Sequence, residues 1–167
     1  PEPEIEAQIP KHQISSSAQL APALRSTLMR KHRESNDSSL GGLRIAMKFL
    51  DRDTVEYSLA QAAAGDAGQR AAAMQTLDAA LNLKDPVWGG FYQYSTHGDW
   101  QHPHFEKLLA VQAGYLRIYA QAYAQLDKPQ YAEAARSTQR YLRDFLSSPE
   151  GAIYASQDAD LVPGQHS

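Results

Sequence analysis

The chain has 167 residues, of which 43% are hydrophobic, so it is long enough to bury a core of its own. Its 16 Lys and Arg residues against 19 Asp and Glu give a net charge of −3, which excludes a broad basic surface for nucleic acid or an anionic membrane. Cysteine is absent and no apolar run approaches the roughly 20 residues of a membrane span, so disulfides, thiolate metal sites and transmembrane helices are excluded. We expect a soluble protein, cytoplasmic or exported.

The first residues differ in composition from the rest. Residues 1–16 are rich in Pro and Glu and lack hydrophobic periodicity, which predicts a linker or N-terminal extension. Residues 17–167 are predicted to form one helical domain. Because the chain opens on Pro and ends on turn residues, we expect it to be a piece of a longer protein.

Hydrophobic residues recur every three or four positions in several segments, as is typical of helices that bury one face. The predicted helices cover residues 17–32, 51–65, 68–83, 104–126 and 129–146. Asp51 or Asp53 suits the N-cap of the second helix, and Pro129 suits the first turn of the fifth. Strand patterns are scarce, and residues 91–95 and 152–155 are predicted to form short extended pairs.

The loops between these helices repeat one another. Residues 37–43 (DSSLGGL) match residues 85–91 (DPVWGGF), and residues 148–153 (SPEGAI) are a weaker third copy. The sequence between successive copies is long enough for two helices and their connections. Each unit is therefore a helical hairpin preceded by a glycine turn and a hydrophobic anchor. Since one hairpin cannot bury its apolar face alone, neighbours must stack into an open solenoid or a closed toroid. The alternative is an ordinary bundle with unrelated glycine turns.

Three motifs carry a family resemblance. Residues 89–109 (GGFYQYSTHGDWQHPHFEKLL) closely resemble a motif of long thioredoxin-domain-containing proteins related to the spermatogenesis-associated thioredoxin-like family, in which GGGF-x-x-YS leads through a tryptophan to PHFEKML. Residues 41–49 are similar to the GGFG-x-x-PKFP motif of that family, and residues 151–160 to its GGFYSAEDADS motif. Order and spacing agree along nearly all of residues 37–160.

The resemblance implies an all-α fold. It implies an array of helical hairpins forming part of an α/α toroid of the six-hairpin glycosidase-like type, related in shape to sugar epimerases, with short β-hairpin-like loops on one rim. It also implies a thioredoxin-like domain in the full-length protein and about half of the ring in this chain. A half-ring exposes apolar edges, so we expect the fragment to self-associate through them.

Departures from the family pattern affect its carboxylates. Ala110 and Val111 stand where the family has Tyr-Asp, Gln157 replaces the glutamate before Asp-Ala-Asp, and His97 stands at an expected aspartate. If those carboxylates act in relatives, this chain has altered chemistry or none. The departures favour one alternative function, a non-catalytic scaffold or interaction domain that accompanies a thioredoxin-like domain.

The family is largely of unassigned activity, so the reaction must be argued from the residues. We expect a carbohydrate-active protein that is sugar epimerase- or isomerase-like before glycoside hydrolase-like. Epimerisation needs a base that removes a proton beside a carbonyl, which suits histidine, whereas hydrolysis needs two carboxyl groups. The candidate catalytic residues are His102, His104, Glu106 and Asp158. The candidate substrate-binding residues are Lys48, Tyr92, Tyr94, Trp100 and Asp160.

Structural roles compete with these assignments. His104 and Glu106 begin a predicted helix, where they could serve as caps, and Lys107 could pair at the surface with Glu106 or Asp99. A metal site is disfavoured because Pro103 breaks the register of the His-x-His-x-Glu pattern. We assign no metal and no cofactor.

The aromatic residues of the middle loop divide into two groups. Trp88, Phe91 and Phe105 are predicted to be core anchors. Trp100 has polar neighbours and is the predicted platform for a sugar ring, because an aromatic face stacks on apolar C–H groups.

Overall fold

The computed structural model describes residues 19–160. It divides into two compact units, Pro1–Arg33 and Glu34–Ser167. Helix α1 (Pro22–Ser35) begins in the first unit, and its first residue is a proline, which suits a position whose N–H would have no helical partner. The predicted linker, residues 1–16, lies outside the described residues.

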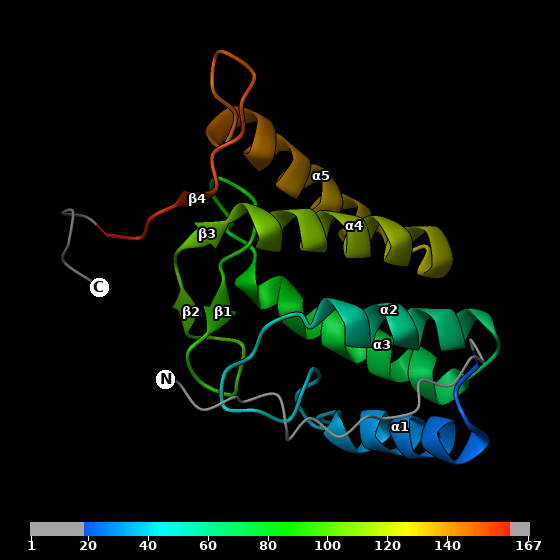
Figure 1. Ribbon diagram of the computed structural model, residues 1–167. Coiled ribbons are helices and arrows are strands. Elements are labelled where there is room, and N and C mark those ends of the chain that lie inside the picture. Colours follow the sequence, from blue (N-terminus) through cyan, green and yellow to red (C-terminus); the bar gives the residue numbers. More distant parts are fainter. Residues whose placement is uncertain (1–18, 161–167) are drawn as a thin grey trace, which may run out of the picture. The chain divides into compact units, whose positions relative to one another are not determined.

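The second unit is built from helical hairpins. Helices α2 (Arg52–Ala63) and α3 (Ala67–Ala80) form one hairpin, which a short 3₁₀ turn, η2 (Leu81–Leu83), extends. Helices α4 (Leu109–Leu126) and α5 (Pro129–Phe145) form the next. Helix α2 also packs against α4, so the two hairpins lie side by side (Figure 1).

The helix ends follow local capping chemistry. The Asp51 side chain accepts a hydrogen bond from the N–H of Thr54 and caps α2, as predicted. Asp66 caps α3 in the same way. Helix α4 ends at Leu126, its C-cap Asp127 has a left-handed φ of 50°, and Pro129 then occupies the first turn of α5.

Short strands lie between the helices. Strand β1 (Tyr94–Ser95) pairs antiparallel with β2 (Pro103–His104), and β3 (Lys107–Leu108) pairs antiparallel with β4 (Ser156–Gln157). The prediction of a helix from residue 104 is therefore wrong at its start. Residues 103–108 bond to strands before and after them in the chain, and the helical ladder starts only at Leu109.

The loop repeat is confirmed as a structural repeat. The N–H of Asp37 donates to the Gly42 carbonyl at 2.8 Å, and the N–H of Asp85 donates to the Gly90 carbonyl at 3.0 Å. In the third copy the corresponding bond joins Ser148 to Ala152 at 2.8 Å. An isolated antiparallel bridge closes each turn: Asn36 with Leu43, Lys84 with Phe91, and Ser147 with Ile153.

The first glycine of the first two turns lies close to a helix, and the first glycine of the third turn does not. A Cβ on Gly41 would lie 3.0 Å from Thr76 Cα in α3, and a Cβ on Gly89 would lie 2.6 Å from Ser137 Oγ in α5. Each of these turns thus packs against the second helix of the hairpin that follows it. Around Gly151, no other atom lies within 4 Å of the position that a Cβ would take, among the residues that the structure describes.

The core of the second unit contains aromatic residues from the turn and from α4. The Phe91 ring is fully buried, with its centroid 4.2 Å from that of Tyr115 and 5.3 Å from that of Tyr119, which confirms Phe91 as an anchor. Trp88 and Phe105 were predicted as anchors too, but they are 59% and 57% exposed, so that prediction is wrong. Within residues 19–160, no helix has the length and apolarity needed to cross a bilayer.

Candidate functional site

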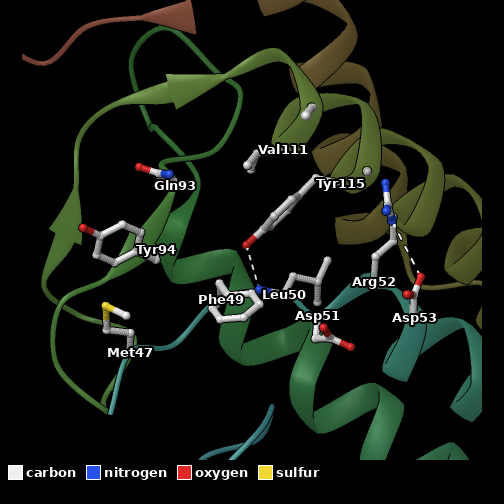
Figure 2. Close-up of a pocket in the computed structure, with 12 residues that line it drawn as sticks. Met47, Phe49, Leu50, Asp51, Arg52, Asp53, Gln93, Tyr94, Val111 and Tyr115 are labelled. Carbon is white, nitrogen blue, oxygen red and sulfur yellow. Dashed lines mark hydrogen bonds and ion pairs between the residues drawn. The ribbon is translucent and has the colours of Figure 1, made fainter. Parts of the chain in front are cut away.

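A pocket of about 450 Å³ lies in the second unit (Figure 2). Three chain segments line it: the segment that leads into α2, the start of β1 with the residue before it, and the first turns of α4. The lining residues are Met47, Phe49, Leu50, Asp51, Arg52, Asp53, Gln93, Tyr94, Ala110, Val111, Gly114 and Tyr115. The pocket therefore collects residues from the beginnings of both hairpins.

The walls of the pocket are largely apolar and aromatic. Phe49, Tyr94 and Val111 supply apolar surface. The Tyr115 ring extends from α4 toward Leu50, whose N–H donates to the Tyr115 hydroxyl at 3.1 Å (Figure 2). Burial raises the pKa of Tyr115 well above its usual range, because an apolar setting disfavours the phenolate.

One end of the pocket carries charges of both signs at the N-terminus of α2. Asp51 caps the helix through the N–H of Thr54 at 2.9 Å. The Arg52 Nε lies 3.9 Å from Asp53 Oδ1, and both side chains are more than half exposed, so this pair is weak. Two carboxylates stand beside one guanidinium at this end, which does not favour an anionic ligand.

Tyr94, His104 and Glu106 come together next to the pocket, which Tyr94 lines and the other two residues do not. The Tyr94 ring lines the pocket and stacks on the His104 ring, with centroids 4.9 Å apart. The His104 Nε2 lies 3.6 Å from Glu106 Oε2, and the two side chains are 33% and 30% exposed. The backbone N–H of Gln93 holds this arrangement by donating to both the His104 and Glu106 carbonyls. Neither residue caps α4, whose N-cap is Leu108, so the capping alternative is wrong.

His102 lies on the exposed loop between β1 and β2. Its Nδ1 is 2.9 Å from Asp99 Oδ2, and its ring centroid is 4.3 Å from that of His97. The hydrogen bond from the Gln101 N–H is the main cause of the lowered pKa of the Asp99 carboxyl, and the hydrogen bond from the His102 side chain adds to it. His102 does not line the pocket that holds Tyr94.

The acidic residues after β4 also lie away from the pocket lining. The Asp158 carboxylate is exposed and accepts the N–H of Asp160 at 3.1 Å. Neither residue lines the pocket. Gln157, which replaces a family glutamate, accepts a hydrogen bond from the Tyr141 hydroxyl at 2.6 Å.

Trp100 is a core anchor, and its predicted role as a sugar platform is wrong. Its side chain is only 1% exposed, and its Nε1 donates to the Leu40 carbonyl at 2.9 Å. Its ring covers Gly42, where a Cβ would lie 2.7 Å from Trp100 Cζ2. A left-handed φ of 65° at Trp100 accompanies this placement, while the polar neighbours in sequence, such as Gln101, stay exposed.

Lys48 is likewise structural, and its predicted role in binding substrate is wrong. The side chain is 2% exposed. Its ammonium bonds to Asp37 Oδ2 at 2.7 Å, to the Leu43 carbonyl at 2.7 Å and to the Gly41 carbonyl at 3.2 Å, which uses all three donors. The hydrogen bond from Lys48 is the main reason that the pKa of Asp37 is far below its usual value. This lysine closes the first glycine turn.

Lys107 repeats that arrangement in the second turn. Its ammonium lies 2.5 Å from Asp85 Oδ2 and 2.9 Å from the Gly89 carbonyl, so the predicted surface pair with Glu106 or Asp99 is wrong.

Tyr92 lies beside this lysine, with its ring centroid 5.3 Å from Lys107 Nζ. Its ring also meets that of Phe105 edge to face at 5.0 Å. Burial raises the pKa of Tyr92, and the nearby Asp85 carboxylate adds to the effect. Tyr92 does not line the pocket.

Sequence reasoning missed several residues of the pocket. From the sequence, Tyr115 was predicted only to belong to the apolar face of a helix, and Gln93 was noted only as a member of the motif at residues 89–109. A usable signal lay at Ala110 and Val111, because these two departures from the family motif line the pocket, whereas the departures at His97 and Gln157 do not. Within residues 19–160, no group of three or more His, Asp or Glu side chains is placed to hold a metal ion.

Comparison with curated proteins identifies relatives in animals. Spermatogenesis-associated protein 20 of Mus musculus is 32% identical over 166 residues, which cover 95% of this chain and 20% of that protein. The Homo sapiens protein of the same name is 34% identical over 138 residues, covering 78% of this chain and 17% of that protein. This chain thus spans about a fifth of the length of these relatives. No protein-family model matches it.

Comparison with solved structures identifies the fold. Cellobiose 2-epimerase from Spirochaeta thermophila DSM 6192 aligns with a TM-score of 0.65 at 19% identity, over 81% of this chain and 41% of that one. The enzyme from Bacillus thermoamylovorans B4167 aligns with a TM-score of 0.60 at 13% identity, over 80% of this chain and 41% of that one. Such low identities show the fold alone, which is that of an α/α toroid. The chain is therefore homologous to one segment of the thioredoxin-domain-containing spermatogenesis-associated protein 20 family, and its fold is part of an α/α toroid.

Proposed function

We propose that this chain contributes a carbohydrate site to a sugar epimerase- or isomerase-like protein. The observation that carries the proposal is the pocket itself, whose aromatic wall at Tyr94 stacks on His104, which in turn lies beside Glu106. Aromatic walls with a few polar groups suit a sugar, which has apolar C–H faces and hydroxyl edges. The solved structures of similar fold are named cellobiose 2-epimerases, which supports a sugar as the ligand.

The chemistry would use His104 as the base. Imidazole can take a proton from the carbon beside the carbonyl of an open-chain sugar, leaving an enediolate. The Glu106 carboxylate, 3.6 Å from Nε2 and so beyond hydrogen-bond distance, would stabilise by its charge the imidazolium that forms. Return of the proton to the other face of the same carbon gives the epimer, and its return to the neighbouring carbon gives the isomer.

Glycoside hydrolysis ranks second on the same residues. That reaction requires two carboxyl groups on either side of the bond. Neither Glu106 nor Asp158 lines the pocket, although Glu106 is paired with the His104 that stacks on Tyr94, and position 111, which does line the pocket, is a valine. The pairing of a histidine with one carboxylate therefore favours proton transfer over hydrolysis.

Deuterium incorporation tests the proposal. The full-length protein is incubated with glucose, mannose or cellobiose in D₂O, and proton NMR follows loss of the signal at C2. His104→Ala should slow the exchange about 100-fold or more, as expected for loss of a general base. The control His97→Ala changes an exposed histidine bonded to Thr96 and should leave the rate unchanged. Absence of exchange in the unaltered protein with every sugar would contradict the proposal.

A non-catalytic scaffold is the second candidate, and two observations favour it. Gln157 is uncharged and its oxygen is engaged by Tyr141, while Val111 supplies an apolar wall where the family carries a carboxylate. Under this alternative the pocket would hold a sugar or a partner without proton exchange. Sugar binding without any C2 exchange in the D₂O experiment would favour it.

A further inference from the structure

The Tyr115 hydroxyl has an unused proton at the pocket wall. The residue is 3% exposed, and its oxygen accepts the Leu50 N–H at 3.1 Å (Figure 2). A phenol has one proton to donate, and no acceptor for it is found within residues 19–160. Because a buried donor without an acceptor is costly, this proton is available to a molecule in the pocket.

The Gln93 amide lies on another side of the same pocket. Figure 2 shows Gln93 beside Tyr94, across from the segment of α4 that carries Tyr115. Its backbone N–H is engaged by the carbonyls of His104 and Glu106, which fixes the residue in place. Its side-chain amide, which can both donate and accept, has no hydrogen-bond partner in the part of the chain that the structure describes.

The charge distribution favours an uncharged ligand. Tyr115 and Gln93 are neutral, and the α4 wall between them is formed by Ala110 and Val111. At the far end, Asp51 serves as the cap of α2 and Arg52 lies near Asp53, so an anionic ligand would find no unopposed positive charge. The volume of about 450 Å³ is in the range of small-molecule pockets.

We infer that Tyr115 and Gln93 bind a neutral polyhydroxyl ligand directly, with Tyr115 donating its hydroxyl proton to a ligand oxygen and the Gln93 amide bonding a neighbouring hydroxyl. This inference rests on the proposed function and names the groups that position the substrate. Apolar C–H faces of the ligand would lie against Phe49 and Val111. Neither Tyr115 nor Gln93 is assigned a part in proton transfer.

A pair of tyrosine variants tests the inference. Tyr115→Phe removes one hydroxyl and keeps the ring, so the Kd of the full-length protein for glucose or cellobiose should rise about 3- to 10-fold in calorimetry. The matched control is Tyr119→Phe, because the fully buried Tyr119 donates its hydroxyl to the Leu77 carbonyl at 2.8 Å and does not line the pocket. Each variant loses one buried hydrogen bond, but only Tyr115→Phe should weaken sugar binding.

Gln93→Met is the second variant, since it removes the amide at similar size and should also raise the Kd. If sugar binds and both pocket variants bind it as tightly as the unaltered protein, the inference is overturned while the proposed function stands. If a sugar phosphate binds ten times more tightly than the neutral sugar, the neutral ligand class is wrong. If no sugar binds and no C2 exchange occurs, both the inference and the proposed function fail.

Discussion

The ammonium of Lys107 lies inside the second glycine turn, where it bonds to the Asp85 carboxylate and the Gly89 carbonyl. The Tyr141 ring covers it at 4.3 Å. Burial lowers the pKa of Lys107, and it would raise that of Asp85, but the hydrogen bonds from Lys107 and the turn N–H groups outweigh burial and lower the pKa of Asp85. The two charges therefore depend on each other.

Breaking this pair should be costly. Lys107→Met leaves the Asp85 carboxylate, which is 5% exposed, without its counter-ion, so the free energy of unfolding in urea should fall by about 3–5 kcal/mol. Adding Asp85→Asn to Lys107→Met should recover part of that loss, because no buried charge then remains. Arg140→Met, which breaks an exposed pair with Glu133, should cost under about 1 kcal/mol. Equal losses for Lys107→Met and Arg140→Met would contradict the structural role of the buried pair.

Several residue roles were not predictable from local sequence. Trp100 has polar neighbours, yet a left-handed backbone at that residue accompanies a buried ring that covers Gly42. Lysine is usually found at the surface. Lys48 and Lys107 are buried, and only the folded turn shows the carboxylate and carbonyl groups that pair with each of them. The motif did indicate the neighbourhood of His104 and Glu106, because both belong to PHFEK.

At the scale of the element, the glycine turns and the helices they pack against form one unit. Gly89 has a φ of 78°, and a Cβ added there would meet Ser137, whereas Gly151 has a φ of 86°, and a Cβ added there would meet no described residue within 4 Å beyond its chain neighbours. The two glycines thus share a backbone conformation and differ in packing. Comparing the stability cost of a substitution at each glycine therefore separates the effect of backbone strain from that of steric contact.

Alanine substitutions at the two glycines should differ in cost. Gly151→Ala should lower the free energy of unfolding by about 1–2 kcal/mol, the cost of a left-handed conformation with a Cβ. Gly89→Ala should lower it by about 1–3 kcal/mol more, because the new Cβ would lie 2.6 Å from Ser137 Oγ and force α5 to move. Urea denaturation measures both. Equal costs would show that packing of the turn against α5 contributes nothing.

The helices were predictable to within a few residues where the period was clear. Residues 129–146 were predicted and α5 covers Pro129–Phe145, since Pro129 and the apolar spacing both act locally. The start of α4 was not predictable, because residues 103–104 pair with β1 and residues 107–108 pair with β4. Pairing with distant segments leaves no periodic signal within the segment itself.

At the scale of the whole second unit, the repeated turns bring the beginnings of both hairpins to one rim. The pocket lies there, between the segment before α2 and the first turns of α4. The matching residues of the turns predicted the repeat, and the family resemblance implied the toroid and its rim. The pocket required the structure, since its lining comes from three segments that are separated along the chain.

A sugar titration of the ¹⁵N-labelled protein, followed by NMR, tests most directly whether this rim is a carbohydrate site. We predict that amide shifts will concentrate at pocket residues, among them Asp53, Tyr94 and Gly114. The amides of Lys128 and Gln130, at the opposite end of the α4–α5 hairpin, should stay unchanged. Shifts confined to residues outside the pocket, or no shifts with any neutral sugar, would contradict the account.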